Sequence, residues 1–314
     1  MDKIRIFLLA WLHLRSQNGP VSLVKRFSYK DLKKATDGFR RTTDNSSRGS
    51  SYKARFQNGV VSTIKEVEGF SECDDASFYR EVQLLGRLHH RHIVALRGFS
   101  TGPKRYLVFE NVERGSLKEH LSDPLKTPLN WRTRLQIVVG IAAALEYLHF
   151  FCDPPVYHVS ISSSTIMLDE NLTPKIIKQF SFALQLSDIS LIRSAGNQVT
   201  LPNSSSCIKE CTGQTCKNII FQLGLLILEL ITGQSSERNG ADLVQWVQKT
   251  YISRSTHEIM DPDIGNNYDQ AELQSLLNVA RLCIKSLDKP KIYTSQILWY
   301  LQKKVRIVRD KHRY

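Results

Sequence analysis

Two groups of side chains could do chemistry by their type and spacing: three thiols, and a run of hydroxyls. Cys207, Cys211 and Cys216 lie close together in the sequence, and thiolates are ligands that zinc prefers. Their spacing contains no Cys-x-x-Cys pair and no histidine lies nearby, so we expect reduced thiols and no metal site. The hydroxyls run from Ser160 to Thr165. A serine hydroxyl is not a usable base near neutral pH without an activating partner, so this run does not by itself supply a general base.

The elements that would position these residues are predicted to be strands first and helices afterwards. Asn58-Gly59 is a strong turn signal between two strands, at 51–56 and 60–65. Phe78, Val82 and Leu85 recur at helical spacing and predict a helix over 75–88. Ser, Thr, Asn and Gly dominate 187–215, which predicts a loop. Further strands are expected at 92–100, 106–110, 166–168 and 175–177, and helices at 117–121, 131–150, 219–231, 243–250 and 270–286.

Short motifs spread along the chain resemble those of the plant receptor-like kinases, in the Pelle-related protein kinase family. The matching segments are Phe27–Phe39, Phe78–Gly98, Leu107-Val-Phe-Glu-Asn111, Ala144–His149, Cys152-Asp-Pro-Pro155, Leu228–Gly233 and Asp261-Pro262. The resemblance implies an α+β, bilobal protein-kinase-like fold with a small β-rich lobe and a larger α-helical lobe. It divides the chain into an appendage at 1–26, an N-terminal lobe at 27–113, a C-terminal lobe at 114–300 and a basic tail at 301–314.

The resemblance assigns several residues to nucleotide binding. Lys65 matches the lysine that holds the α- and β-phosphates of ATP, and Glu81 matches its glutamate partner. Glu110 and Val112 match the hinge that borders adenine, and Met167 matches the floor of the adenine pocket.

The glycine-rich loop that normally approaches phosphate falls on Asp44, Ser46, Gly49 and Ser51, so only the third glycine survives. A carboxylate at 44 would repel phosphate oxygens. ATP binding is therefore expected to be weak at best.

The groups that perform phosphoryl transfer are missing at the matching positions. The family's catalytic-loop aspartate is Ser160, its lysine is Ser162 and its Mg²⁺-binding asparagine is Thr165. The second Mg²⁺ ligand, an aspartate, is Gln179 if one residue is inserted near Ile177. A neutral amide is a poor ligand for Mg²⁺, so we expect no metal to be held.

Three supporting residues of the family are also replaced. The glutamate that forms a buried ion pair in the C-terminal lobe falls on Cys207, and its arginine partner falls on Lys289. The aspartate that braces the catalytic loop falls on Ile219. The resemblance therefore implies a protein kinase homologue without activity, a pseudokinase that acts as a scaffold or allosteric partner of active receptor-like kinases.

Three alternatives stay open from the sequence. A residual serine/threonine kinase with weak transfer would show Mg²⁺-dependent activity. A nucleotide-binding switch without catalysis would bind ATP without needing Mg²⁺. A decaying gene product would lack a cooperative melt.

Composition and the N-terminus restrict partners and location. The net charge is +13, but lysines and arginines are spread out without an aromatic-interleaved stripe, which favours solvated basic faces over nucleic-acid binding. Apolar residues 6–14 are too few to span a bilayer. They leave open a surface-lying helix or the remnant of a longer membrane segment. We expect a cytoplasmic protein, and association of its N-terminus with the cytoplasmic face of the plasma membrane stays open.

Overall fold

The computed structural model describes residues 24–40, 42–46, 49–67, 75–153, 155–157, 159–177, 204–237, 240–252, 256–286 and 292–304. The chain forms two compact units. The first comprises Met1–His89 and Ala95–Asn111, and the second comprises His90–Val94 and Val112–Tyr314. The predicted order, strands first and helices afterwards, is confirmed.

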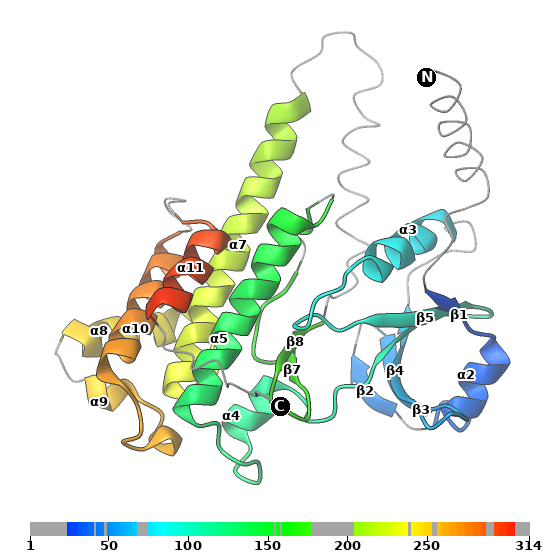
Figure 1. Ribbon diagram of the computed structural model, residues 1–314, viewed down its shortest axis with the longest axis horizontal. Helices are drawn as coiled ribbons and strands as arrows, with labels where there is room; N and C mark the ends of the chain where they lie inside the picture. The colour runs from blue at the N-terminus through cyan, green and yellow to red at the C-terminus, as the bar shows by residue number, and fades with distance from the viewer. Residues whose placement is uncertain are drawn as a thin grey trace, which may run out of the picture. The chain divides into compact units, whose positions relative to one another are not determined.

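The first unit is built on a six-stranded sheet with the order β1-β5-β6-β4-β3-β2 (Figure 1). Its strands are β1 (Lys25–Arg26), β2 (Thr42–Ser46), β3 (Gly49–Arg55), β4 (Val61–Val67), β5 (Leu96–Thr101) and β6 (Arg105–Glu110). β1 pairs in parallel with β5, so the sheet begins inside the stretch that the sequence grouped with the appendage. All other neighbours are antiparallel.

The predicted hairpin between β3 and β4 is confirmed. Phe56 N donates to Val60 O at 2.9 Å, and the Asn58 side chain accepts from Val60 N at 3.2 Å. Gly59 has a φ of 80°, a left-handed conformation that glycine adopts without steric cost. The Asn-Gly pair therefore specifies the turn and fixes the register of the two strands.

Helix α2 (Tyr29–Ala35) covers one face of the sheet. Ser28 caps its N-terminus by accepting a hydrogen bond from Asp31 N at 3.1 Å. Buried residues of α2, β3, β4 and β6 form one apolar cluster: Leu32, Tyr52, Ala54, Ile64, Tyr106 and Val108. Helix α3 (Asp75–Gly86) packs on the other face, where Phe78 and Phe99 of β5 have ring centroids 6.1 Å apart.

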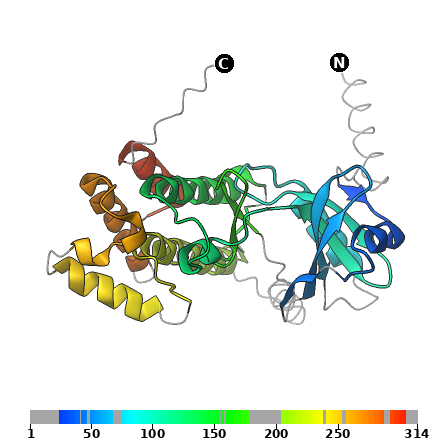
Figure 2. The ribbon, with the colours of Figure 1, turned by 90° about the horizontal axis from the view of Figure 1, so that it is seen from below.

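The second unit is mostly helical. Its helices are α4 (Leu117–Ser122), α5 (Trp131–Glu146), α7 (Ser204–Thr232), α8 (Gly240–Ile252), α9 (Thr256–Ile259), α10 (Gln270–Lys285) and α11 (Thr294–Lys304). A π-helical turn at Tyr147–Phe151, a 3-10 turn at Pro262–Ile264 and a two-stranded sheet of β7 (Ile166–Leu168) and β8 (Pro174–Ile176) complete it. α10 packs along α7, and α11 packs along α5 (Figure 2).

Close approach between these helices depends on particular residues. A Cβ at Gly224 of α7 would lie 2.9 Å from the Cβ of buried Cys283 on α10, so a larger residue there would force the helices apart. Among the described residues, Trp131–Phe151 is long and apolar enough to cross a membrane, but 61% of its apolar window is buried inside the protein. That burial is typical of a core helix.

Two predicted boundaries are wrong. The loop expected over 187–215 gives way to helix at Ser204, because α7 runs without a break through Thr232. Its first half lacks an apolar period, but a helix that is anchored by an apolar segment extends at little cost per residue. The strand expected over 92–100 begins only at Leu96. The preceding Ile93 instead bridges to Ile176 in the second unit.

Candidate functional site

Lys65 and Glu81 belong to the same layer of the first unit. Burial alternates along β4, so Lys65 points away from the face that carries Ile64 and α2. Its cross-strand neighbours are Ser51 and Leu107, and Leu107 in turn pairs with Phe99. Because the Phe99 ring contacts Phe78 of α3, Lys65 lies on the face that α3 covers.

Glu81 lies on the buried side of α3. Phe78, Glu81, Val82 and Leu85 are all buried, at the spacing of a single helical stripe. The Glu81 side chain is only 8% exposed, although it is charged. A carboxylate kept in this stripe is costly unless a cation or hydrogen-bond donor compensates it. The structure thus brings both predicted residues to one side of the sheet.

The predicted glycine-rich loop is a hairpin between β2 and β3. Ser46 pairs with Gly49 and Asn45 with Ser50 in an antiparallel ladder. The backbone of Asp44 pairs with Ser51, and Ser51 pairs with Lys65. Asp44 therefore occupies the cross-strand row of Lys65, two strands away, or roughly 10 Å.

The predicted hinge begins at the end of β6. The Glu110 carboxylate accepts a hydrogen bond from Ala95 N at 3.2 Å and lies 3.6 Å from the Arg97 guanidinium. It is therefore held against β5. Within the part of the chain that the structure describes, the backbone N–H and C=O of Val112 have no hydrogen-bond partner. Such groups are what an adenine ring requires from a hinge.

The hydroxyl-rich segment that contains Ser160, Ser162 and Thr165 is closed on itself. The Thr165 hydroxyl accepts from Ser162 N at 3.0 Å and lies 2.9 Å from Ser160 O, to which it can donate. The Ser162 and Ser164 hydroxyls are 2.9 Å apart. Thr165 is buried, so its oxygen serves the turn and is not available as a metal ligand.

The Ser160 hydroxyl has no hydrogen-bond partner among the described residues. No described histidine or carboxylate therefore activates it. Gln179, predicted at the other Mg²⁺ position, and the neighbouring Lys178 lie outside the described residues. Met167, the predicted adenine floor, is half-buried on β7, between buried Ile166 and Leu168.

Neighbouring elements fix this segment from two sides. Lys118 N of α4 donates to Ser163 O at 2.9 Å. The Lys118 ammonium pairs with Glu237, and hydrogen bonds from Lys118 and Ser164 lower the pKa of the Glu237 carboxyl. The Gln222 side chain of α7 accepts a hydrogen bond from Ile161 N at 2.8 Å.

The contact from Gln222 was missed in the sequence. Ile219, where the bracing aspartate was expected, is buried and apolar. Gln222 lies three residues later, hence on the same side of the helix. The signal was available, because Gln222 and Glu229 are the only polar side chains with charge or amide groups between Ile219 and Ile231.

Comparison with known proteins identifies the family. The family model for protein tyrosine and serine/threonine kinases matches residues 45–263, more than half of the chain. The chain belongs to this kinase family. A probable receptor-like protein kinase of Arabidopsis thaliana is 35% identical over 294 residues, covering 88% of this chain and 43% of the relative. The calcium/calmodulin-regulated receptor-like kinase 2 of the same plant is 30% identical over 295 residues, covering 93% and 66%.

The kinase domain spans less than two thirds of the length of these two relatives. The predicted resemblance to plant receptor-like kinases is confirmed. Solved structures agree on the bilobal fold. An apo pseudokinase, GRMZM2G135359, has a TM-score of 0.73 at 21% identity over 90% of this chain and 94% of its own. The pseudokinase domain of BIR2, described as an immune regulator of the RLK/Pelle family, has a TM-score of 0.70 at 25% identity over 88% and 84%.

One buried ion pair and two buried histidines support this kinase domain away from the predicted site. Arg134 of α5 forms an ion pair with Asp261 at 2.7 Å and donates to Leu230 O at 2.9 Å. Burial lowers the pKa of His92 to about 4, and one ring nitrogen lies 2.9 Å from Pro174 O. Burial likewise lowers the pKa of His149 to about 4. These histidines are neutral structural groups at neutral pH.

Proposed function

We propose that this chain is an inactive receptor-like kinase domain, a pseudokinase, which acts by binding partner proteins such as active receptor-like kinases. The observation that carries the proposal is the closed hydroxyl segment from Ser160 to Thr165. Phosphoryl transfer requires a base or water-positioning carboxylate and bound Mg²⁺. In this segment Ser160 offers a hydroxyl, and the Thr165 oxygen is used by backbone hydrogen bonds.

The hydrogen bonds that hold the hydroxyl segment in place favour the same proposal. Gln222 holds Ile161 N, and α4 holds Ser163 O, so the segment keeps a defined conformation without the residues that transfer requires. BIR2, a structural neighbour at 25% identity, is described as a pseudokinase and an immune regulator. A regulatory role through protein binding is consistent with that neighbour.

Nucleotide binding without efficient transfer is the second candidate, a residual ATP-binding serine/threonine kinase. Within the first unit, Lys65 and Glu81 are retained on the α3 side of the sheet, where a lysine suits phosphate groups. Within the second unit, the backbone groups of Val112 have no partner among the described residues, as an adenine ring requires. The register that keeps Asp44 in the row of Lys65 argues for weak affinity. Such a residual kinase would need Mg²⁺, whereas a nucleotide-binding switch would bind ATP without it.

The decisive assay is phosphoryl transfer from radiolabelled ATP by the full chain, with Mg²⁺ or Mn²⁺, onto itself and onto a generic protein substrate. The expected result is a signal equal to that of Lys65→Ala. Transfer above background that disappears in Lys65→Ala would overturn the proposal and support the residual kinase. An active receptor-like kinase, purified in the same way, is the positive control.

A thermal melt with ATP separates the remaining candidates. A ligand at 100 times its Kd adds about 2.7 kcal/mol to the folded state, which raises the Tm by roughly 5 °C in a protein of this size. An ATP-induced rise without Mg²⁺ would indicate a nucleotide-binding switch. A rise that needs Mg²⁺ would favour the residual kinase. A sharp melt with no rise would leave protein binding alone.

We further propose that the domain acts at the cytoplasmic face of the plasma membrane. The relatives are named as receptor-like kinases, and a receptor-like name favours a place at the membrane. The net charge of +13 adds attraction to anionic lipids of the inner leaflet. A fluorescent fusion expressed in plant cells would test this, with free cytosolic signal as the contrary outcome.

A further inference from the structure

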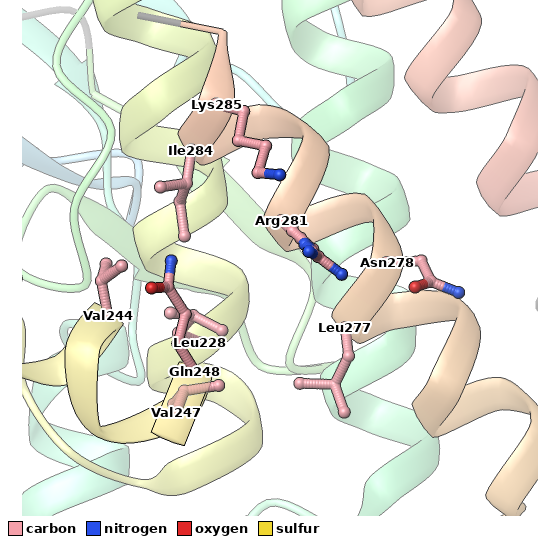
Figure 3. Close-up of a pocket in the computed structure, with 9 residues that line it drawn as sticks. All are labelled: Leu228, Val244, Val247, Gln248, Leu277, Asn278, Arg281, Ile284 and Lys285. Atoms are coloured by element: carbon pink, nitrogen blue, oxygen red, sulfur yellow. The ribbon is translucent and has the colours of Figure 1, made fainter. Parts of the chain in front are cut away.

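A cavity of about 230 Å³ lies wholly inside the helical unit, between α7, α8 and α10 (Figure 3). Its lining is mostly aliphatic. Leu228 of α7, Val247 of α8 and Leu277 of α10 are buried. Val244 and Ile284 are half-buried at its sides. These side chains leave an apolar recess next to the protein surface that no other described residue fills.

The edge of the cavity is basic. Arg281 and Lys285 are exposed and lie four residues apart on α10, so they share one side of the helix. Among the described residues, no carboxylate lies within ion-pair distance of either cation. Two like charges at this spacing repel each other unless an anion joins them. The edge is therefore complementary to an acidic group.

The size of the cavity restricts what it can hold. Pockets for drug-sized ligands or cofactors are usually about 300–1,000 Å³, so this one is small for them. An apolar cavity of about 150 Å³ accepts a benzene molecule. The recess therefore suits one bulky aliphatic or aromatic side chain, which is how a protein partner anchors itself in a pocket. Gln248 and Asn278, both exposed, add hydrogen-bonding groups at the edge.

We propose that the α7–α8–α10 cavity is a docking site for an acidic segment of a partner protein that inserts one bulky apolar side chain between Arg281 and Lys285 on one side and Val244 on the other. The proposal deepens the partner binding proposed above and rests on it. Its test needs neither ATP nor phosphoryl transfer. If the proposed lack of phosphoryl transfer were wrong, kinase activity would be detected. If the proposed docking site were wrong, only the peptide-binding results would contradict it.

The experiment selects peptides from a random library displayed on phage, using the immobilised full chain. We expect the selected peptides to carry a large apolar residue flanked by aspartate or glutamate. Synthetic versions of them should lose at least about tenfold in affinity for the double variant Arg281→Glu/Lys285→Glu, measured by fluorescence polarisation. Val244→Phe, which partly fills the recess, should weaken the same peptides without reversing any charge.

A matched control is available on α2. Lys30 and Lys34 are exposed, have the same four-residue spacing and lie in the other unit. The double variant Lys30→Glu/Lys34→Glu changes the net charge equally and should bind the peptides as the unmodified chain does. A melt of every variant shows that each is folded.

Several outcomes would overturn the docking site. The library could yield no enriched peptides, or the selected peptides could lack acidic residues. The selected peptides could also bind the Arg281→Glu/Lys285→Glu chain with unchanged affinity. If dodecanoate bound the chain and no peptide displaced it, the occupant of the cavity would be a lipid and not a protein partner. Dimerisation of the chain in sedimentation that the charge reversal abolishes would make a second copy the occupant.

Discussion

Replacing Arg134 by methionine should destabilise the helical unit severely. The guanidinium is 1% exposed and makes three contacts: with Asp261 Oδ2 at 2.7 Å, with Leu230 O at 2.9 Å and with Leu129 O at 2.8 Å. Methionine keeps most of the side-chain volume but leaves the buried Asp261 carboxylate without its cation. Breaking a buried pair in this way costs about 3–5 kcal/mol, a large part of the 5–15 kcal/mol that stabilises a typical domain.

The assay is urea unfolding of the full chain, followed by tryptophan fluorescence. Trp131 lies on the same helix and is buried, so its emission reports on this region. Arg132→Met is the matched control, because Arg132 is exposed on the same helix and its loss should change stability by no more than about 0.5 kcal/mol.

A double variant tests the mechanism. In Arg134→Met/Asp261→Asn neither charge is left unpaired, so its loss of stability should be smaller than the sum of the two single losses. If Arg134→Met costs less than about 1 kcal/mol, or if the single losses simply add, the buried pair is not what holds α5 to the segment at Asp261.

Further predictions concern the hydroxyl segment and the buried histidines. Gln222→Leu should cost about 1–3 kcal/mol in urea unfolding, because the Ile161 N–H loses its partner, whereas Gln222→Glu should cost less. Ser160→Asp alone should leave phosphoryl transfer at background in the radiolabelled ATP assay, since the Mg²⁺ ligands stay absent; detectable transfer would contradict this. His92 and His149 have pKa values near 4 when folded and 6.5 when unfolded, so the unfolded chain binds protons first. The contribution of each histidine to stability should be level above pH 6.5 and should fall between pH 6.5 and 4, by about 3 kcal/mol for each histidine. His149→Gln should reduce that slope in urea midpoints measured across pH, and an unchanged slope would refute the assignment.

Much of the fold could be predicted because local signals determined it. The Asn58-Gly59 turn and the alternating burial along β4 are readable in the sequence, and so is the stripe of Phe78, Val82 and Leu85. The start of α7 at Ser204 could not be predicted, since its polar first half depends on an apolar second half. The assignment of Ile93 also failed, because its bridge to Ile176 is a long-range contact.

The predicted site shows the same division. The family resemblance could assign Lys65, Glu81 and Ser160 to a predicted site, because each lies in a segment whose neighbours retain the family pattern. The isolated amide of Gln222 in an apolar run indicates a polar role, but its partner Ile161 lies 61 positions away and could not be predicted from spacing. The α7–α8–α10 cavity is similar, since three helices contribute to it and each looks like an ordinary amphipathic helix on its own.

The hydrogen bonds around the hydroxyl segment bear on whether this chain is the product of a decaying gene. Accumulated damage would leave buried donors unpaired, because each replacement would remove a partner without supplying another. Around the hydroxyl segment the opposite holds for the backbone donors of Ile161 and Ser162. Ile161 N is held by Gln222 although the bracing aspartate is an isoleucine, and Ser162 N is held by the Thr165 hydroxyl.

Each of these hydrogen bonds preserves the conformation of a loop that lacks the groups for transfer. Selection that kept the shape of the loop but not its chemistry would produce this pattern. A shape is useful to a partner that binds the surface, whereas it is of no use to a reaction without a base. The repaired loop therefore favours a folded binding protein over both a decaying gene product and an enzyme.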